Sequence, residues 1–313
     1  MRPDKNTTKT RIVFDASAKQ DGISLNDTIH HGPKLQNDLF AVLLRFISNA
    51  VAIMCDIAEM YYQINMKAKD RSLHRFLWMD LDQSKQPDVY QFSRIVFGVN
   101  SSPFLAQFVS QRNAITYQSK YSLAADTVLN STYMDDSMDC VKDIPTAIKL
   151  REELVNLWGT AGMHARKWLS NSPAVLNDIP SEECATSVNF DSGQTPSTKS
   201  LGVMWHPEAD MFTFSSMQPD LAKFTKRSFL SSTASLFDPL KFLTPFTVRA
   251  RIILQKIWME GFQWDELLEA NLAMKATKWF NEFPQLDNIQ VPRYLSVDNG
   301  MDCTPHLHTF VDA

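Results

Sequence analysis

The feature that most constrains the fold of this chain is a pair of adjacent carboxylates, Asp135 and Asp136, preceded by Tyr133 and Met134. Apolar or β-branched residues lie on both sides of the pair: Thr127, Val128, Leu129 and Thr132 before it, and Met138, Cys140 and Val141 after it. This pattern predicts a β-hairpin whose turn carries both acids. Adjacent carboxylates repel one another, so folding alone gives little reason for the pair. A bound divalent cation would remove the conflict.

A third carboxylate for a metal site would best come from the end of a buried strand, where its position is rigid. Asp56 fits, because it follows the apolar run of residues 51–55. Two cations roughly 4 Å apart can stabilise the attacking and leaving oxygens of a phosphoryl transfer. Carboxylates suit Mg²⁺, and Mn²⁺ can replace it. We therefore expect Asp56, Asp135 and Asp136 to hold two Mg²⁺ ions, although a solvated strand end and a solvated turn are the plainer reading of these acids.

Composition sets the class of protein. The chain has 313 residues, of which 44% are hydrophobic, as in soluble globular proteins with one large or two modest domains. No apolar run reaches the length of a membrane span, and the N-terminus has no signal-peptide core. We expect an intracellular protein, cytoplasmic or nuclear, with no membrane partner. The four cysteines form no CxxC pair, which favours free thiols over a zinc site or disulfides.

The formal net charge of −4 argues weakly against nucleic-acid binding, but the basic residues are clustered and could line a groove. Up to about residue 216 the pattern alternates between strand-like and helical, and beyond it the pattern is mostly helical. A strand is expected at 51–57, and further strands at 75–81, 89–97, 201–205 and 211–214. The main helices are expected near 34–47, 103–120, 145–158, 220–234, 245–261 and 264–283.

Five segments resemble, in the family's order, the conserved blocks of retroelement reverse transcriptases. They are MCDIAEMYYQI at 54–64, FGVNSSPF at 97–104, YMDD at 133–136, GMHARKW at 162–168 and LGVMW at 201–205. Each block alone is a weak signal, whereas five in order make coincidence improbable. The helical tail, with TKR at 225–227, FDPL at 237–240 and Trp258, is similar to the BEL/Pao group of LTR retrotransposons. The resemblance covers nearly the whole chain.

The resemblance implies an α+β right-hand polymerase fold. Residues 1–216 would form partial fingers and an antiparallel-sheet palm, and residues 217–290 a helical thumb or connection. Residues 291–313 would be a linker and the first strand of a truncated RNase H domain, with Asp312 as its first carboxylate. Related enzymes have more fingers sequence before Arg11, so we expect incomplete fingers. A single RNase H carboxylate cannot hold two metals, so we expect no RNase H activity.

The resemblance also implies roles for the residues around the acids. Tyr61 would exclude a ribose 2′-hydroxyl, or else be an ordinary core aromatic. The backbone N–H groups of Glu59 and Met60 would hold the triphosphate. Lys167 would protonate the leaving pyrophosphate, or else be a surface lysine that contacts phosphate.

Five further positions take roles from the same resemblance. Arg11 would pack on the incoming nucleotide, or else be a surface arginine on an edge strand. Phe97 and Gly98, in the second block, would belong to the substrate-binding site. Gly98 would let the backbone approach the template–primer, or else be a simple turn glycine. Met204 and Trp205 would belong to the primer grip.

The expected activity is RNA-directed DNA polymerisation, a nucleotidyl transfer from dNTP to a primer 3′-hydroxyl on an RNA or DNA template. The expected partners are the template–primer and other parts of a pol polyprotein, namely protease, RNase H and integrase. Two alternatives stay open. One is a catalytically idle retroelement remnant that acts as a nucleic-acid-binding or interaction protein, and the other is a two-metal nuclease.

Overall fold

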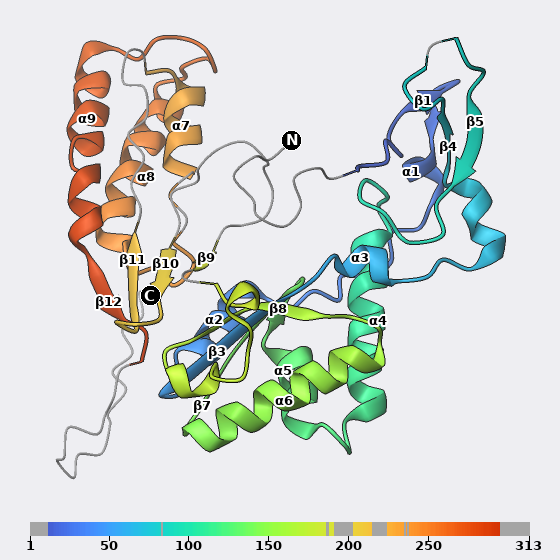
Figure 1. Cartoon of the computed structure of the whole chain (residues 1–313). Coiled ribbons are helices and arrows are strands. Elements are labelled where there is room, and N and C mark those ends of the chain that lie inside the picture. The colour runs from blue at the N-terminus through green and yellow to red at the C-terminus, as the bar shows by residue number, and fades with distance from the viewer. Residues whose placement is uncertain are drawn as a thin grey trace. The chain divides into compact units, whose positions relative to one another are not determined.

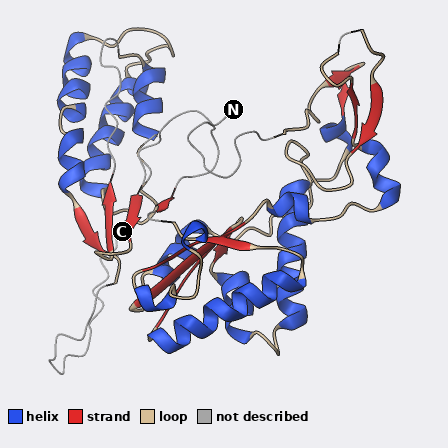
Figure 2. Ribbon diagram, viewed as in Figure 1, coloured by secondary structure: helices blue, strands red, loops and turns tan. Residues whose placement is uncertain are grey.

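The computed structural model describes residues 12–82, 84–185, 188–190, 203–214, 224–234, 236 and 238–294. Their helices and strands are drawn in Figures 1 and 2. The contacts divide the chain into two units. The first comprises residues 1–38, 54–139 and 148–168, and the second comprises residues 39–53, 140–147 and 169–313. The division passes through strands of one sheet, and the expected boundary at residue 216 stays a prediction.

That sheet has four strands in the order β6-β7-β3-β8. Their bounds are β3 Val51–Ile57, β6 Thr132–Tyr133, β7 Asp136–Val141 and β8 Ala165–Ser170. Every residue of β3 except Asp56 is buried. A continuous apolar run forms such a strand because both of its faces are covered. The expected strand at 51–57 is therefore confirmed.

The hairpin of β6 and β7 is also confirmed, but its first arm is shorter than expected. Residues 127–129 belong to helix α5, Ser122–Asn130, and not to the strand. The carboxylate of Glu153 accepts hydrogen bonds from the amides of Leu123 and Ala124, at 2.8 and 3.2 Å. These bonds satisfy N–H groups that the first turn of a helix leaves without partners. Tertiary capping thus favours a helix over the strand preference of Thr127 and Val128.

Two longer helices accompany α5. Helix α4, Ser102–Tyr117, begins with Pro103 in its first turn, where the missing N–H does no harm. Helix α6, Ile144–Thr160, buries Ala147, Leu150, Leu154, Leu157 and Trp158. Both helices lie where the sequence places them.

The remainder of the first unit consists of short elements. They are β1 Lys19–Gln20, β2 Ile23–Ser24, α1 Leu25–Thr28, α3 Met60–Gln63, a 3₁₀ helix Ala68–Leu73, β4 Arg75–Trp78 and β5 Asp88–Gln91. Strands β4 and β5 are shorter than the strands expected at 75–81 and 89–97, and they pair in antiparallel fashion. Near the N-terminal end of the described residues, Val13 and Phe97 form one parallel bridge.

The second unit contains α2, Leu39–Phe46, and a sheet in the order β12-β11-β10-β9. The strands are β9 Val188–Phe190, β10 Val203–His206, β11 Met211–Phe214 and β12 Gln290–Pro292. Strands β10 and β11 form the expected hairpin. Residues 291 and 292, which the sequence assigns to a linker, instead pair with β11.

The C-terminal helices of the second unit are α7 Lys226–Ala234, α8 Thr244–Met259 and α9 Ala270–Phe280, followed by a 3₁₀ helix Phe283–Asn288. They lie side by side in Figure 1. Their core is aromatic: Phe229, Trp279, Phe280 and Phe283 are almost fully buried and make ring contacts with one another. None of the described helices is both long and apolar enough to cross a lipid bilayer.

Candidate functional site

Asp56 lies near the end of β3 with its side chain only 14% exposed. One carboxylate oxygen, Oδ2, accepts a hydrogen bond from the ammonium group of Lys167. The other, Oδ1, is 3.6 Å from Nε of Arg166. The carboxylate therefore faces two cationic side chains from β8.

Oδ1 of Asp56 and Nε of Arg166 are buried and make no hydrogen bond. A buried polar atom without a partner costs about 1–3 kcal/mol, so such atoms often mark a site that a ligand completes. A hard cation is a suitable partner for a carboxylate oxygen. The Asp56 carboxylate is thus a ligand of the type that Mg²⁺ prefers, with Lys167 and Arg166 beside it.

The turn of the β6–β7 hairpin lies beside this position. The backbone N–H of Ile57 donates to the carbonyl oxygen of Asp135 at 3.0 Å. Because Ile57 follows Asp56 directly, this bond brings the turn acids to the end of β3. Asp135 and Asp136 are both exposed to solvent.

The turn has an unusual backbone at Met134, whose φ of 58° lies in the left-handed region. Two-residue hairpin turns need positive φ at their first central position, which a non-glycine residue adopts at some cost. Nε2 of Gln107, a buried residue of α4, donates to the Met134 carbonyl at 3.0 Å. This bond helps to hold the turn. No local sequence pattern indicates Gln107, because the contact joins residues 27 positions apart in the chain.

Lys167 also has a left-handed backbone, with a φ of 54° inside β8. Just before this strand, the carbonyl of His164 accepts a hydrogen bond from Ala58 N–H at 2.8 Å. The end of β3 is thus held by the hairpin turn and by the segment leading into β8. Arg166 is a second residue that sequence reasoning missed here.

Within the described residues, no group of three or more His, Cys, Asp or Glu side chains is arranged to hold a metal ion. The carboxylate of Asp56 is engaged by Lys167, and the other two acids point from an exposed turn. Binding of two cations by the three acids would require the Lys167 side chain to leave Asp56.

Tyr61 lies in α3 and is half-buried. Its ring stacks on Phe97, with 4.5 Å between the centroids and 26° between the planes. The ring of Tyr62 meets Phe97 edge-on at 6.0 Å. Glu59 precedes α3 in a left-handed conformation, with a φ of 48°, and Met60 is buried. Tyr61 is therefore a supported aromatic at the edge of the core rather than within it.

Gly98 is required by the protein's own backbone. Its φ is 97°, and a Cβ added there would lie 1.9 Å from the carbonyl oxygen of Phe14. This approach accompanies the hydrogen bond from Phe14 N–H to the Phe97 carbonyl, at 2.8 Å. The glycine thus has a structural reason independent of any template.

The two residues expected in the primer grip differ in exposure. Met204 is half-buried, whereas the Trp205 side chain is fully buried. The Trp205 ring meets Phe46 edge-on, with 5.0 Å between centroids. Any primer contact made by Trp205 would therefore come from its backbone.

Cys55, next to Asp56, is buried, and this burial raises the pKa of its thiol. Among the described residues, Cys55, Cys140 and Cys184 are thiols and form no disulfide. Arg11 and Asp312 lie outside the described residues, so their expected roles stay predictions.

Comparison with known proteins gives two similarities. Residues 225–313 match the family model described as the Pao retrotransposon-like RNaseH-like domain. No curated protein matches this chain.

A solved structure entitled "Structure of the foamy viral protease-reverse transcriptase dRH in complex with ds DNA" matches with a TM-score of 0.57 and 11% identity. The match covers 88% of this chain and 41% of that chain. At this identity the likeness concerns the fold, and the chain spans well under half the length of that protein. The chain is thus similar to retrotransposon and retroviral pol proteins, by its mixed α/β fold and by its C-terminal family match.

Proposed function

We propose that this chain is the reverse transcriptase core of a BEL/Pao-like retrotransposon, an RNA-directed DNA polymerase with an α+β right-hand fold. The observation that carries the proposal is the hydrogen bond from Ile57 N–H to the Asp135 carbonyl, which brings the acidic turn to the end of the strand bearing Asp56. The fold of the foamy viral protease-reverse transcriptase, solved in complex with double-stranded DNA, supports it.

Bound Mg²⁺ ions would supply electrostatic stabilisation of the attacking 3′-oxygen and of the leaving pyrophosphate. Asp56 and Asp135 would hold both ions, and Asp136 would assist them. Oδ1 of Asp56, buried without a hydrogen bond, is the oxygen best prepared for this role. Mn²⁺ would serve as a substitute.

The neighbouring residues would orient the dNTP. Tyr61, supported by Phe97, would lie against the sugar and exclude a 2′-hydroxyl. The N–H groups of Glu59 and Met60, at the start of α3, would donate to triphosphate oxygens. Lys167, once separated from Asp56, would be free to protonate the leaving pyrophosphate.

The template–primer would be contacted mainly through phosphate and sugar, because copying requires indifference to sequence. Arg11 would pack on the incoming nucleotide, and Met204 would belong to the primer grip. The protease, RNase H and integrase parts of a pol polyprotein would be the natural protein partners.

Primer extension with Mg²⁺ on a primed RNA template tests the proposal. We expect Asp135→Asn to lower the rate by about 100-fold or more, since removal of one preorganised charge costs that much. Asp126→Asn is the matched control, because Asp126 is exposed in α5 and its bond from Asn130 reaches Oδ1, which asparagine retains. Equal rates for wild type and Asp135→Asn would refute the polymerase proposal.

The second candidate is an idle remnant that binds nucleic acid or protein without catalysis. The engagement of Asp56 by Lys167 favours it, because the acids are not already grouped around a cation. Template–primer binding without extension in either Mg²⁺ or Mn²⁺ would support this candidate. Degradation of the template without added dNTP would instead indicate a nuclease.

A further inference from the structure

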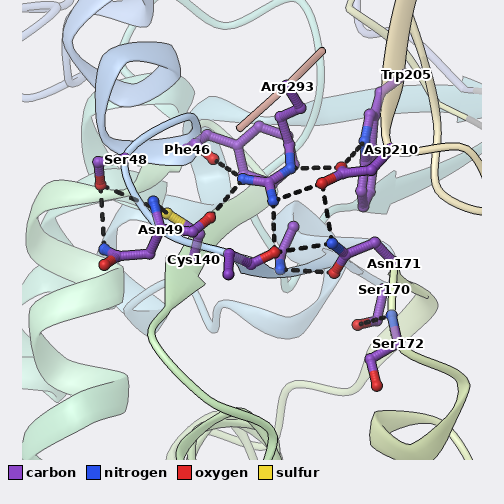
Figure 3. A network of polar contacts seen from close by, with 12 residues as sticks. Phe46, Ser48, Asn49, Cys140, Ser170, Asn171, Ser172, Trp205, Asp210 and Arg293 are labelled. Atoms are coloured by element: carbon purple, nitrogen blue, oxygen red, sulfur yellow. Dashed lines mark hydrogen bonds and ion pairs between the residues drawn. The ribbon is translucent and has the colours of Figure 1, made fainter. Parts of the chain in front are cut away.

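Arg293 is a fully buried cation at the end of β12, with no exposed side-chain surface. Its guanidinium lies between the carboxylate of Asp210 and the backbone carbonyls of Phe46 and Asn49 (Figure 3). Nε donates to Oδ1 of Asp210 at 2.7 Å, and Nη2 donates to Oδ2 at 2.9 Å. A bidentate pair of this kind fixes orientation as well as distance.

The same guanidinium reaches the end of α2 and the segment that leads into β3. Nη1 donates to the Phe46 carbonyl at 2.6 Å and to the Asn49 carbonyl at 2.9 Å. Nη2 donates to the Ala50 carbonyl at 2.7 Å. The last carbonyls of a helix have no partner within the helix and attract cations, so the arginine completes this end of α2.

Asp210 collects the remaining contacts. It lies in the turn between β10 and β11 with a left-handed φ of 51°. Its carboxylate also accepts hydrogen bonds from Nε1 of Trp205 and from Nδ2 of Asn171, each at 3.0 Å. Asn171 in turn donates to the Ala50 carbonyl and accepts from Ala52 N–H, at 2.8 and 2.9 Å. One ion pair thus connects the turn, the buried tryptophan and the start of β3.

We infer that Arg293 is a positioning residue, which holds the β10–β11 hairpin against the entry of β3. What the hairpin does there rests on the proposed function, in which it carries the primer grip. Strands β10 and β11 have four residues each and β12 has three, so the ladder of hydrogen bonds between them is short. The arginine adds bonds from this sheet to the end of α2 and the start of β3 through a single side chain.

Loss of the guanidinium would leave the Asp210 carboxylate and three carbonyls short of donors in a buried place. The hairpin would then move relative to β3. Placement of a primer should suffer, whereas Asp56 lies at the other end of β3 from the segment that Arg293 bonds, and the other two acids lie at the β6–β7 turn. We therefore expect weaker binding of template–primer with little change in turnover once it is bound.

The experiment compares Arg293→Gln with Arg249→Gln, which also removes a bidentate arginine–carboxylate pair, but one that is partly exposed on α8. We expect Arg293→Gln to speed amide hydrogen exchange in residues 203–214 by about 10-fold or more, while residues 132–141 keep wild-type exchange. We also expect the Kd for template–primer to rise about 10-fold, with kcat within about twofold of wild type.

A charge-matched double variant separates positioning from simple stability. Adding Asp210→Asn to Arg293→Gln removes the partly buried charge that has lost its cation, so Tm should recover in part while the Kd for template–primer stays raised. Recovery of both together would overturn the positioning role. If Arg293→Gln does not fold, Arg293→Lys keeps the charge and fewer donors, and should show the same changes to a smaller extent.

Wild-type exchange in residues 203–214 of a folded Arg293 variant would overturn the inference, whatever the enzyme does. A second outcome separates the two proposals. If the wild type extends no primer but Arg293→Gln still speeds amide exchange in residues 203–214, the anchoring of the hairpin is supported and the proposed function is refuted. The two proposals can therefore fail separately.

Discussion

The ammonium group of Lys167 is bonded to the carboxylate of Asp56, so a cation of the protein occupies the place where the proposed function needs a metal ion. The lysine side chain is 43% exposed and can move away into solvent. Arg166 is 3.6 Å from the other carboxylate oxygen and less exposed, at 21%. Binding of a metal ion to Asp56 would thus release Lys167, the candidate proton donor, so that the carboxylate exchanges one cation for another.

This exchange predicts that Lys167→Met strengthens metal binding in the absence of nucleic acid. An ion pair of this exposure is worth up to ~1 kcal/mol, so the affinity for Mn²⁺ should rise about fivefold. Titration of the protein with Mn²⁺, followed by electron paramagnetic resonance of the free ion, measures this affinity. Lys142→Met is the control, because Lys142 is exposed in the turn after β7. An unchanged or weaker Mn²⁺ affinity in Lys167→Met would contradict the exchange.

Gly98→Ala should destabilise the fold, because the new Cβ meets the Phe14 carbonyl and the φ of 97° disfavours any side chain. We expect the free energy of unfolding to fall by about 2–4 kcal/mol. Gly159→Ala is the matched control, since Gly159 lies in α6 with nothing within 4 Å of an added Cβ. Alanine there should gain up to ~1 kcal/mol. Urea denaturation of both variants checks the difference, and equal stability would disprove the close approach.

Gln107→Met should loosen the acidic turn by removing the donor to the Met134 carbonyl. Gln111→Met is closely matched, because Gln111 lies one turn later in α4 and donates to the Leu35 carbonyl at 2.9 Å. Both variants should lose about 1 kcal/mol of stability. Only Gln107→Met should also lower kcat for primer extension, by roughly 10-fold, since it alone touches the turn. Equal effects of the two variants on kcat would remove the turn-holding role from Gln107.

The ion pair between Arg249 and Glu282 should contribute stability that depends on pH. Its hydrogen bonds lower the pKa of Glu282 below its ordinary value of 4.5, against a smaller opposing effect of burial. A lowered carboxyl pKa gives stability that is present above about pH 4.5 and is lost as pH falls through the folded-state pKa. Glu282→Gln should cost about 0.2–1 kcal/mol at pH 7 and almost nothing at pH 2, by urea denaturation at both pH values. A cost that persists at pH 2 would point to packing instead.

Local patterns predicted most of the elements well. The apolar run of β3 and the period of α6 come from residues close in sequence, and the structure has both where they were expected. Residues 127–129 were misassigned because two β-branched residues favour a strand. The competing influence, capping of α5 by Glu153, comes from another helix and leaves no local trace.

The same distinction holds for the candidate site. Asp56 and the turn acids could be singled out because carboxylates in such positions need a reason. The pairing of Lys167 with Asp56 depends on how β8 lies beside β3, which no local pattern reveals. The strand at Gln290–Pro292 was missed for a related reason: three residues that include a proline carry little strand signal, and their partner β11 is distant in sequence.

The bond between Arg293 and the Phe46 carbonyl joins residues 247 positions apart. At about 5–20 residues per second, translation takes roughly 12–50 s to proceed from residue 46 to residue 293. The end of α2 and the start of β3 are therefore synthesised well before Arg293. Over that interval the Phe46 and Asn49 carbonyls lack their guanidinium donor, whereas the Ala50 carbonyl can already accept from Asn171. A nascent chain released before residue 293 would lack the bond between Arg293 and the Phe46 carbonyl. The β10–β11 hairpin can therefore be held against the start of β3 only after translation has passed residue 293.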